Sequence, residues 1–151
     1  MKNVTLFLLL FLPALTPSPT KVTFKPDDIV GFWMTTENML KVQVYKAGNE
    51  YRGKIVWFED AHYKAKMEEC RDEMNSDPKL RDRKVLGLEV VTALKYNAED
   101  NNWQDGRIYD SNSGKTYDSE VNMHTTSTLT VTGYWMFTWL GEDMTFYRVA
   151  K

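Results

Sequence analysis

The sequence predicts an all-β protein in which about eight antiparallel strands close into a barrel, with one long charged excursion between two of them. Two observations carry this prediction. Apolar and polar residues alternate with a period of two in several short segments, which is the pattern of a strand with one buried face. Turn-forming residues separate most of these segments, as in a chain of hairpins.

The predicted strands, in chain order, are 29–35, 39–46, 51–58, 85–96, 103–109, 115–124, 128–135 and 143–149. The second is the clearest, because Leu40, Val42 and Val44 fall on one face. Residues 110–114 read Asp-Ser-Asn-Ser-Gly, and short polar side chains followed by glycine favour a tight turn. We therefore expect 103–109 and 115–124 to pair as a hairpin.

The charged excursion, residues 59–84, contains Pro78 and lacks the alternation of a strand. It is either a solvated surface connection or a docking site for another protein. About eight antiparallel strands with one buried face form either a sandwich or a closed barrel. We favour the barrel because closure removes the exposed strand edges, and no predicted helix is long enough to cover them.

Residues 1–20 have the order of an export signal, with Lys2 before the apolar run 4–12 and small or turn-forming residues after it. That run is too short to span a bilayer, which takes about 20 apolar residues. We therefore expect a signal peptide at 1–20, one domain at 21–151, and a periplasmic or secreted protein with no membrane span. Loss of Lys2 would change the formal net charge from −2 to −3, and an acidic chain offers no electrostatic basis for binding nucleic acid.

Cys70 is the chain's one cysteine, so no intrachain disulfide can stabilise the fold. One interpretation is that Cys70 is a reactive thiol, which acts in redox chemistry or pairs with another chain. The other is that Cys70 lies in a polar connection between strands and has no role. We favour the second interpretation.

Gly31 and Trp33 in the first strand, together with Arg148 in the last, resemble the signature of lipocalin-like barrels. The resemblance implies that the arginine lies over the tryptophan ring and closes one end of the barrel, which is a structural role. Such a cation–π contact contributes about 0.5 to 2 kcal/mol.

The mature chain also resembles domain of unknown function family 2147, a group of uncharacterised exported bacterial proteins. The matching positions are Gly31, Trp33, 53–56, Gly87, 106–110, 114–117, 129–134 and Arg148. Many members have a close cysteine pair in the central loop, where this chain has Cys70 alone. Members also tend to have tryptophan shortly before the last arginine, where this chain has Phe146. The resemblance carries no assigned activity.

No arrangement of residues indicates catalysis or a cofactor. His62 and His124 lie at no metal-ligand spacing from each other or from Cys70. A cluster of acidic residues around one hairpin could either hold a cation or stabilise the turn. We favour stabilisation of the turn, because the sequence pattern of a calcium-binding loop is incomplete. The members of this cluster are Asp105, Asp110, Asp118 and Glu120. We expect a protein that is not an enzyme and holds no metal.

Aromatic residues are frequent in the predicted strands. They either fill the core or form the walls of a cup, because an eight-stranded barrel can pack its interior or hold one small ligand. For the cup, strand alternation selects Trp57, Trp103, Tyr109, Tyr117 and Trp135 as the residues at its mouth. The resulting hypothesis is a binding protein for a small apolar or amphipathic ligand. The alternative is a module that binds an envelope protein through residues 59–84 or the aromatic rim.

Overall fold

The computed structural model describes residues 22–59, 66–134 and 142–151. The predicted signal peptide lies outside the described residues. The elements are η1 (Pro26–Ile29), β1 (Gly31–Thr35), β2 (Leu40–Ala47), β3 (Glu50–Phe58), η2 (Met67–Glu69), η3 (Pro78–Leu80), β4 (Glu89–Asn97), β5 (Asn102–Asp110), β6 (Lys115–Thr125), β7 (Thr128–Tyr134) and β8 (Glu142–Val149). Among the described residues, no helix has the length and apolar character needed to cross a bilayer.

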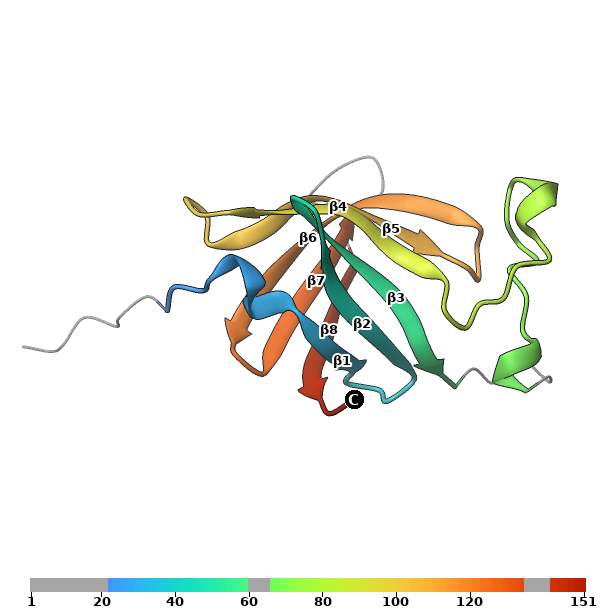
Figure 1. The fold of residues 1–151 in the computed structure, drawn as a ribbon, viewed down its shortest axis with the longest axis horizontal. Helices are drawn as coiled ribbons and strands as arrows, with labels where there is room; N and C mark the ends of the chain where they lie inside the picture. The colour runs from blue at the N-terminus through green and yellow to red at the C-terminus, as the bar shows by residue number, and fades with distance from the viewer. Residues whose placement is uncertain (1–21, 60–65, 135–141) are drawn as a thin grey trace, which may run out of the picture.

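The eight strands form a closed antiparallel barrel in which each strand pairs with the next (Figure 1). β8 returns to pair with β1, so that Trp33 lies opposite Arg148 on one side and opposite Val42 on the other. This closure confirms the predicted barrel and excludes the sandwich. Its physical advantage is that neither edge strand is left unpaired.

The strand boundaries follow the predicted ones closely, with one clear difference. The fourth strand begins at Glu89 and not at Val85, because residues 85–88 form a turn in which the Leu88 amide donates to the Val85 carbonyl. The amide of Val85 itself donates to the Cys70 carbonyl. Val85 and Leu88 are buried in one cluster with Cys70 and with Ile55 of β3.

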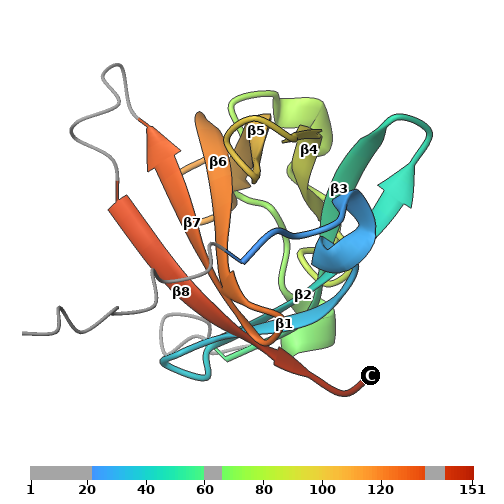
Figure 2. The same cartoon turned by 90° about the vertical axis from the view of Figure 1, so that its left-hand side faces the viewer.

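One end of the barrel is covered by the chain that precedes β1, which crosses that end as Figure 2 shows. Phe24 and Ile29 are buried there in the main apolar core. The hydroxyl of Tyr96 donates to the Phe24 carbonyl at 2.6 Å, and Nε1 of Trp103 donates to the Pro26 carbonyl at 3.0 Å. These bonds fasten the segment to β4 and β5, so we refer to this side as the closed end.

The predicted contact between Arg148 and Trp33 is present at the closed end. The guanidinium carbon lies 4.2 Å from the centroid of the Trp33 ring, and the same group donates to the carbonyls of Val30 and Thr126. Gly31 makes room for it, since a Cβ there would lie 2.4 Å from Nη1 of Arg148. Arg148 therefore joins β8, the β6–β7 turn and the entry to β1.

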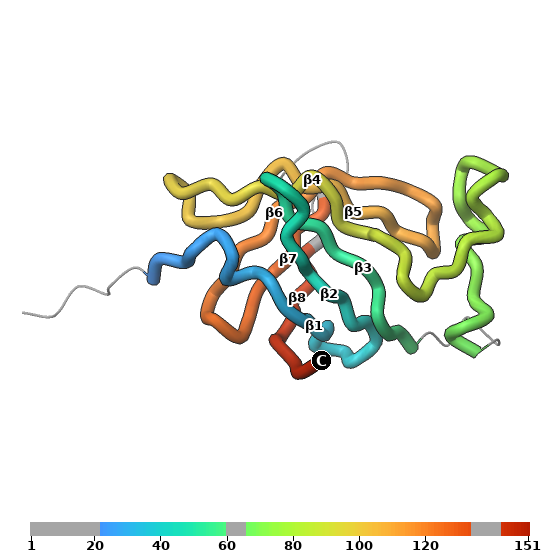
Figure 3. Tube along the Cα trace, in the orientation of Figure 1, coloured from blue at the N-terminus to red at the C-terminus, as the bar shows by residue number. Residues whose placement is uncertain are grey.

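The charged excursion connects β3 to β4, and its described part lies beyond the ends of these strands, away from the closed end (Figures 1 and 3). A buried carboxylate holds it in place. Asp72 is 0% exposed and accepts hydrogen bonds from Arg83 Nε at 2.7 Å, Asn75 Nδ2 at 2.8 Å and the Tyr109 hydroxyl at 2.6 Å. Because Tyr109 belongs to β5, these bonds attach the excursion to the barrel.

Cys70 is part of this attachment. It is 3% exposed and lies in a second apolar cluster with Ile55, Val85, Leu88 and Val90. Burial in an apolar cluster is the usual environment of an inert structural cysteine. The favoured interpretation is therefore wrong in one respect, because Cys70 has a packing role.

Candidate functional site

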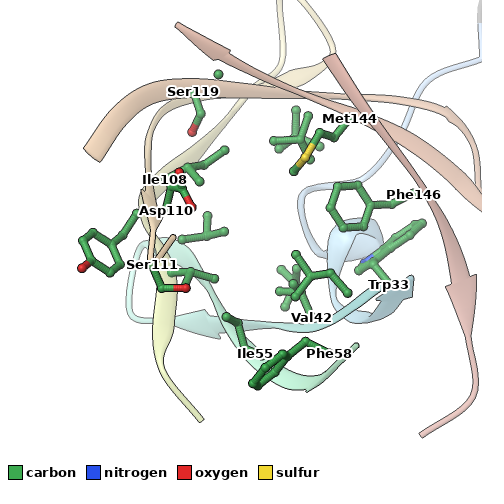
Figure 4. A pocket seen from close by; sticks show the side chains of 18 of the residues that line it. Trp33, Val42, Ile55, Phe58, Ile108, Asp110, Ser111, Ser119, Met144 and Phe146 are labelled. Carbon is green, nitrogen blue, oxygen red and sulfur yellow. The ribbon is translucent and has the colours of Figure 1, made fainter. Parts of the chain in front are cut away.

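The barrel contains a cavity of about 580 Å³, which is within the range of about 300 to 1,000 Å³ typical of small-molecule sites. Its lining runs from Ile29 and Trp33 at the closed end to Glu59 and Asn112 at the opposite end. Figure 4 shows the side chains that surround it. We refer to the end with Glu59 and Asn112 as the mouth.

Strand alternation makes most of the wall apolar. Inward-facing residues recur every second position, as in Leu129 and Val131 on β7 and Met144 and Phe146 on β8. The other apolar lining residues of the strands are Leu40, Val42, Val44, Ile55, Phe58, Val90, Val91, Leu94, Ile108 and Val121. Such a wall favours ligands that lose water from apolar surface on binding.

Polar groups gather at the mouth and at one point of the wall. At the mouth, the Asp110 carboxylate accepts from the Asn112 amide at 2.9 Å and from the Ser113 hydroxyl, so it stabilises its own turn as expected. Farther inside, Ser119 on β6 is 5% exposed. Its Oγ has no hydrogen-bond partner among the described residues, and Figure 4 shows it directed into the cavity.

Two carboxylates, Glu59 and Asp110, are the charged groups among the described lining residues, and no lysine, arginine or histidine belongs to that set. His124 is exposed near the closed end and bonds to Thr130. Within the described ranges, no group of three or more His, Cys, Asp or Glu residues could hold a metal ion. The arrangement can therefore enclose and orient a molecule through apolar contacts and a few hydrogen bonds.

The five predicted mouth residues are placed differently from one another. Tyr117 lines the cavity, and Tyr109 also contacts it, although the Tyr109 hydroxyl is bound to Asp72. Trp103 is 0% exposed and lies at the closed end, bonded to the segment before β1. Trp57 is not among the lining residues. Trp135 lies outside the described residues.

A β-bulge explains the placement of Trp57. Lys41 pairs with Trp57 while its neighbour Val42 pairs with Ile55, so Val56 is an extra residue in β3. An extra residue reverses which positions face inward beyond it. Ile55 and Phe58 consequently line the cavity, and the prediction that Trp57 lines it is wrong.

The position of Trp103 differs from the prediction for a second reason, which is that the segment before β1 covers its ring. Alternation correctly predicts that it faces the interior. The pairing of Trp103 with Val121 places it toward the closed end of β5, whereas Tyr109 and Asp110 are at the mouth. The ring is therefore covered by the chain before β1, and its predicted position at the mouth is wrong.

Sequence reasoning missed Ser119 and Gly133. Both line the cavity, and they lie opposite each other on β6 and β7. The sequence pattern could have identified Ser119, because it lies midway between Tyr117 and Val121 and alternation places all three on the inward face of β6. Gly133 had the same kind of signal, since it follows Leu129 and Val131 at a spacing of two residues.

Burial of two tyrosines predicts sensitivity to alkaline pH. Burial, and then a hydrogen bond to Asp72, raises the pKa of Tyr109, and burial followed by a bond to Asp27 raises the pKa of Tyr51. A raised pKa contributes stability that is complete below the unfolded value of about 10 and is lost as pH rises through the folded value. We expect the Tm to fall between pH 10 and 12. The fall should be smaller in the double variant Tyr51→Phe, Tyr109→Phe, and equal falls in the two proteins would contradict this assignment.

A family model described as an uncharacterised protein conserved in bacteria, DUF2147, matches residues 31–148. The chain belongs to DUF2147. The match begins at Gly31 and ends at Arg148, the two residues that meet at the closed end.

Among solved structures, this DUF2147 chain is similar to protein HP1028 from the human pathogen Helicobacter pylori, which is described as belonging to the lipocalin family. The TM-score is 0.67 and the identity 22%, over 86% of each chain. At this identity the likeness concerns the fold, which is a lipocalin-like barrel. The comparison with curated proteins gives no match.

Proposed function

We propose that this DUF2147 protein is an exported, non-enzymatic binding protein that holds one small apolar or amphipathic molecule inside its barrel. The observation that carries the proposal is the cavity of about 580 Å³ with a mostly apolar wall. A periplasmic or secreted location agrees with the signal-like order of residues 1–20, and cell fractionation tests it: recovery in the cytoplasm with residues 1–20 intact would refute export.

The cavity walls supply the binding energy in this proposal. Each methylene group of a ligand that leaves water for an apolar wall contributes about 0.8 kcal/mol. The wall is attached to a rigid barrel in which every strand has two paired neighbours. A preformed site avoids the entropic cost of ordering loops around the ligand, which raises the affinity.

The proposal is tested by filling the cavity at Gly133. No described atom lies within 4 Å of the position of a Cβ at Gly133, so a side chain there projects into open space in the cavity. We expect the wild-type protein to bind the apolar fluorescent probe N-phenyl-1-naphthylamine saturably at one site. Gly133→Leu should weaken that binding at least about tenfold, which corresponds to about 1.4 kcal/mol, and retain the barrel's circular dichroism spectrum.

Thr132→Leu is the matched control for this variant. It adds the same side chain one position earlier on β7, where Thr132 bonds to Asp143 and alternation directs it away from the cavity. We expect its affinity for the probe to equal that of the wild type. Equal weakening in both variants, or probe fluorescence that never saturates in the wild type, would refute binding inside the barrel.

The alternative, an interaction module for envelope proteins, has one observation in its favour. Met74 and Leu80 of the charged excursion are 58% and 41% exposed. Both belong to a segment that Asp72 holds against β5, and exposed apolar residues are ordinary on protein surfaces. Binding in the cavity therefore remains the better supported function.

A further inference from the structure

Ser119 provides a polar contact inside an otherwise apolar stretch of wall. On β6 its inward neighbours are Tyr117 toward the mouth and Val121 toward the closed end, and both also line the cavity. Its Oγ is buried and lacks a partner within the described part of the chain. Figure 4 shows this side chain directed into the cavity from the strand. A buried hydroxyl without a hydrogen bond is unfavourable, so a ligand group that bonds to it would gain free energy.

Both residues that pair with Ser119 across the sheet are glycines. Ser119 pairs with Gly106 on β5 and with Gly133 on β7. A Cβ on Gly106 would lie 2.7 Å from Oγ of Ser119 and 2.6 Å from Cδ1 of Leu94, so a side chain at this position would displace the hydroxyl. Across three adjacent strands, the serine therefore stands between two positions without side chains.

The charge of the lining selects against anions. Its described charged residues are the carboxylates Glu59 and Asp110. An anionic ligand would lose water in the apolar cavity without a cation among the described lining residues to balance it, and carboxylates at the mouth would repel it. The ligand that suits these surroundings is uncharged.

We propose that the ligand is a neutral, mainly apolar molecule with one hydroxyl or carbonyl oxygen part-way along its length, which hydrogen-bonds to Oγ of Ser119. A serine hydroxyl both donates and accepts, so it can bond to either type of oxygen. This inference rests on the proposed function and names the ligand class for the same cavity.

The test uses matched nine-carbon competitors that displace N-phenyl-1-naphthylamine: 5-nonanone, 5-nonanol, nonane and nonanoate. We expect Ser119→Ala to weaken binding of the ketone and the alcohol about fivefold and to change nonane binding less than about twofold. Nonanoate should bind more weakly than the ketone to the wild type. Ser119→Ala removes a hydroxyl that has no described partner, so its Tm should not fall.

Ser127→Ala in the β6–β7 turn, an exposed position outside the cavity lining, is the control and should bind all four competitors as the wild type does. If nonane and the ketone both bind, and Ser119→Ala leaves both affinities unchanged or weakens both equally, the proposed ligand class is refuted. The proposed function of the cavity would still stand in that case. Tightest binding of nonanoate refutes the neutral ligand. If neither the probe nor any competitor binds, both the proposed function and this inference are refuted.

Discussion

Replacing Trp33 with alanine is expected to lower the free energy of unfolding by about 3 to 5 kcal/mol. Trp33 is 1% exposed, and its Nε1 donates to the Ile29 carbonyl at 2.8 Å. The substitution would leave a void at the closed end, a carbonyl without its donor, and the Arg148 guanidinium without the ring beneath it. Since domains are typically stable by about 5 to 15 kcal/mol, such a loss would leave the barrel marginal. Urea denaturation followed by circular dichroism measures it.

Trp57→Ala is the control for this prediction because it removes the same side chain from a position outside the cavity lining. Its partial exposure and its place after the bulge in β3 predict a loss of about 1 kcal/mol, typical of a substitution outside the core. If Trp57→Ala destabilised the protein as much as Trp33→Ala does, the structural role of the closed end would be contradicted. Trp33→Phe, which retains a ring, should recover part of the stability.

Replacing Asp72 with alanine is expected to cost about 3 kcal/mol, because removal of one partner from a buried ionic and hydrogen-bonded group leaves the others unpaired. Here the guanidinium of Arg83 and the hydroxyl of Tyr109 would lose this acceptor. The amide of Asn75 would lose one of its two acceptors and keep the Tyr109 hydroxyl. The excursion should then detach from β5 before the barrel unfolds. Hydrogen exchange of the amides in residues 66–88 measures the first event, and thermal denaturation measures the second.

Asp82→Ala is the matched control, since Asp82 is exposed within the same excursion. Its effect on stability should stay within about 0.5 kcal/mol, as for most surface substitutions. Unchanged exchange rates and an unchanged Tm in Asp72→Ala would show that the carboxylate does not attach the excursion. A loss of stability with no faster exchange in residues 66–88 would contradict the expected order of events.

The strands and their turns could be predicted from the sequence because their signals are local. The alternation of Leu40, Val42 and Val44 is contained in five consecutive residues, and the polar run at 110–114 specifies its own turn through bonds such as that from the Asn112 amide to Asp110. The contact of Arg148 with Trp33 was expected from a family resemblance, since nothing local joins residues at opposite ends of the chain.

Tertiary structure decided which residues line the cavity. One extra residue at Val56 turned Trp57 away and Phe58 inward, and the segment before β1 covered Trp103. Likewise, the bond from Tyr109 to Asp72 joins residues 37 positions apart. The sequence by itself determined the strands, their approximate limits and the parity of most side chains, because a period of two is set by the backbone of each strand. Only the tertiary structure decided which side chains line the cavity, because a bulge reverses parity and because the packing of distant segments determines which inward residues are covered.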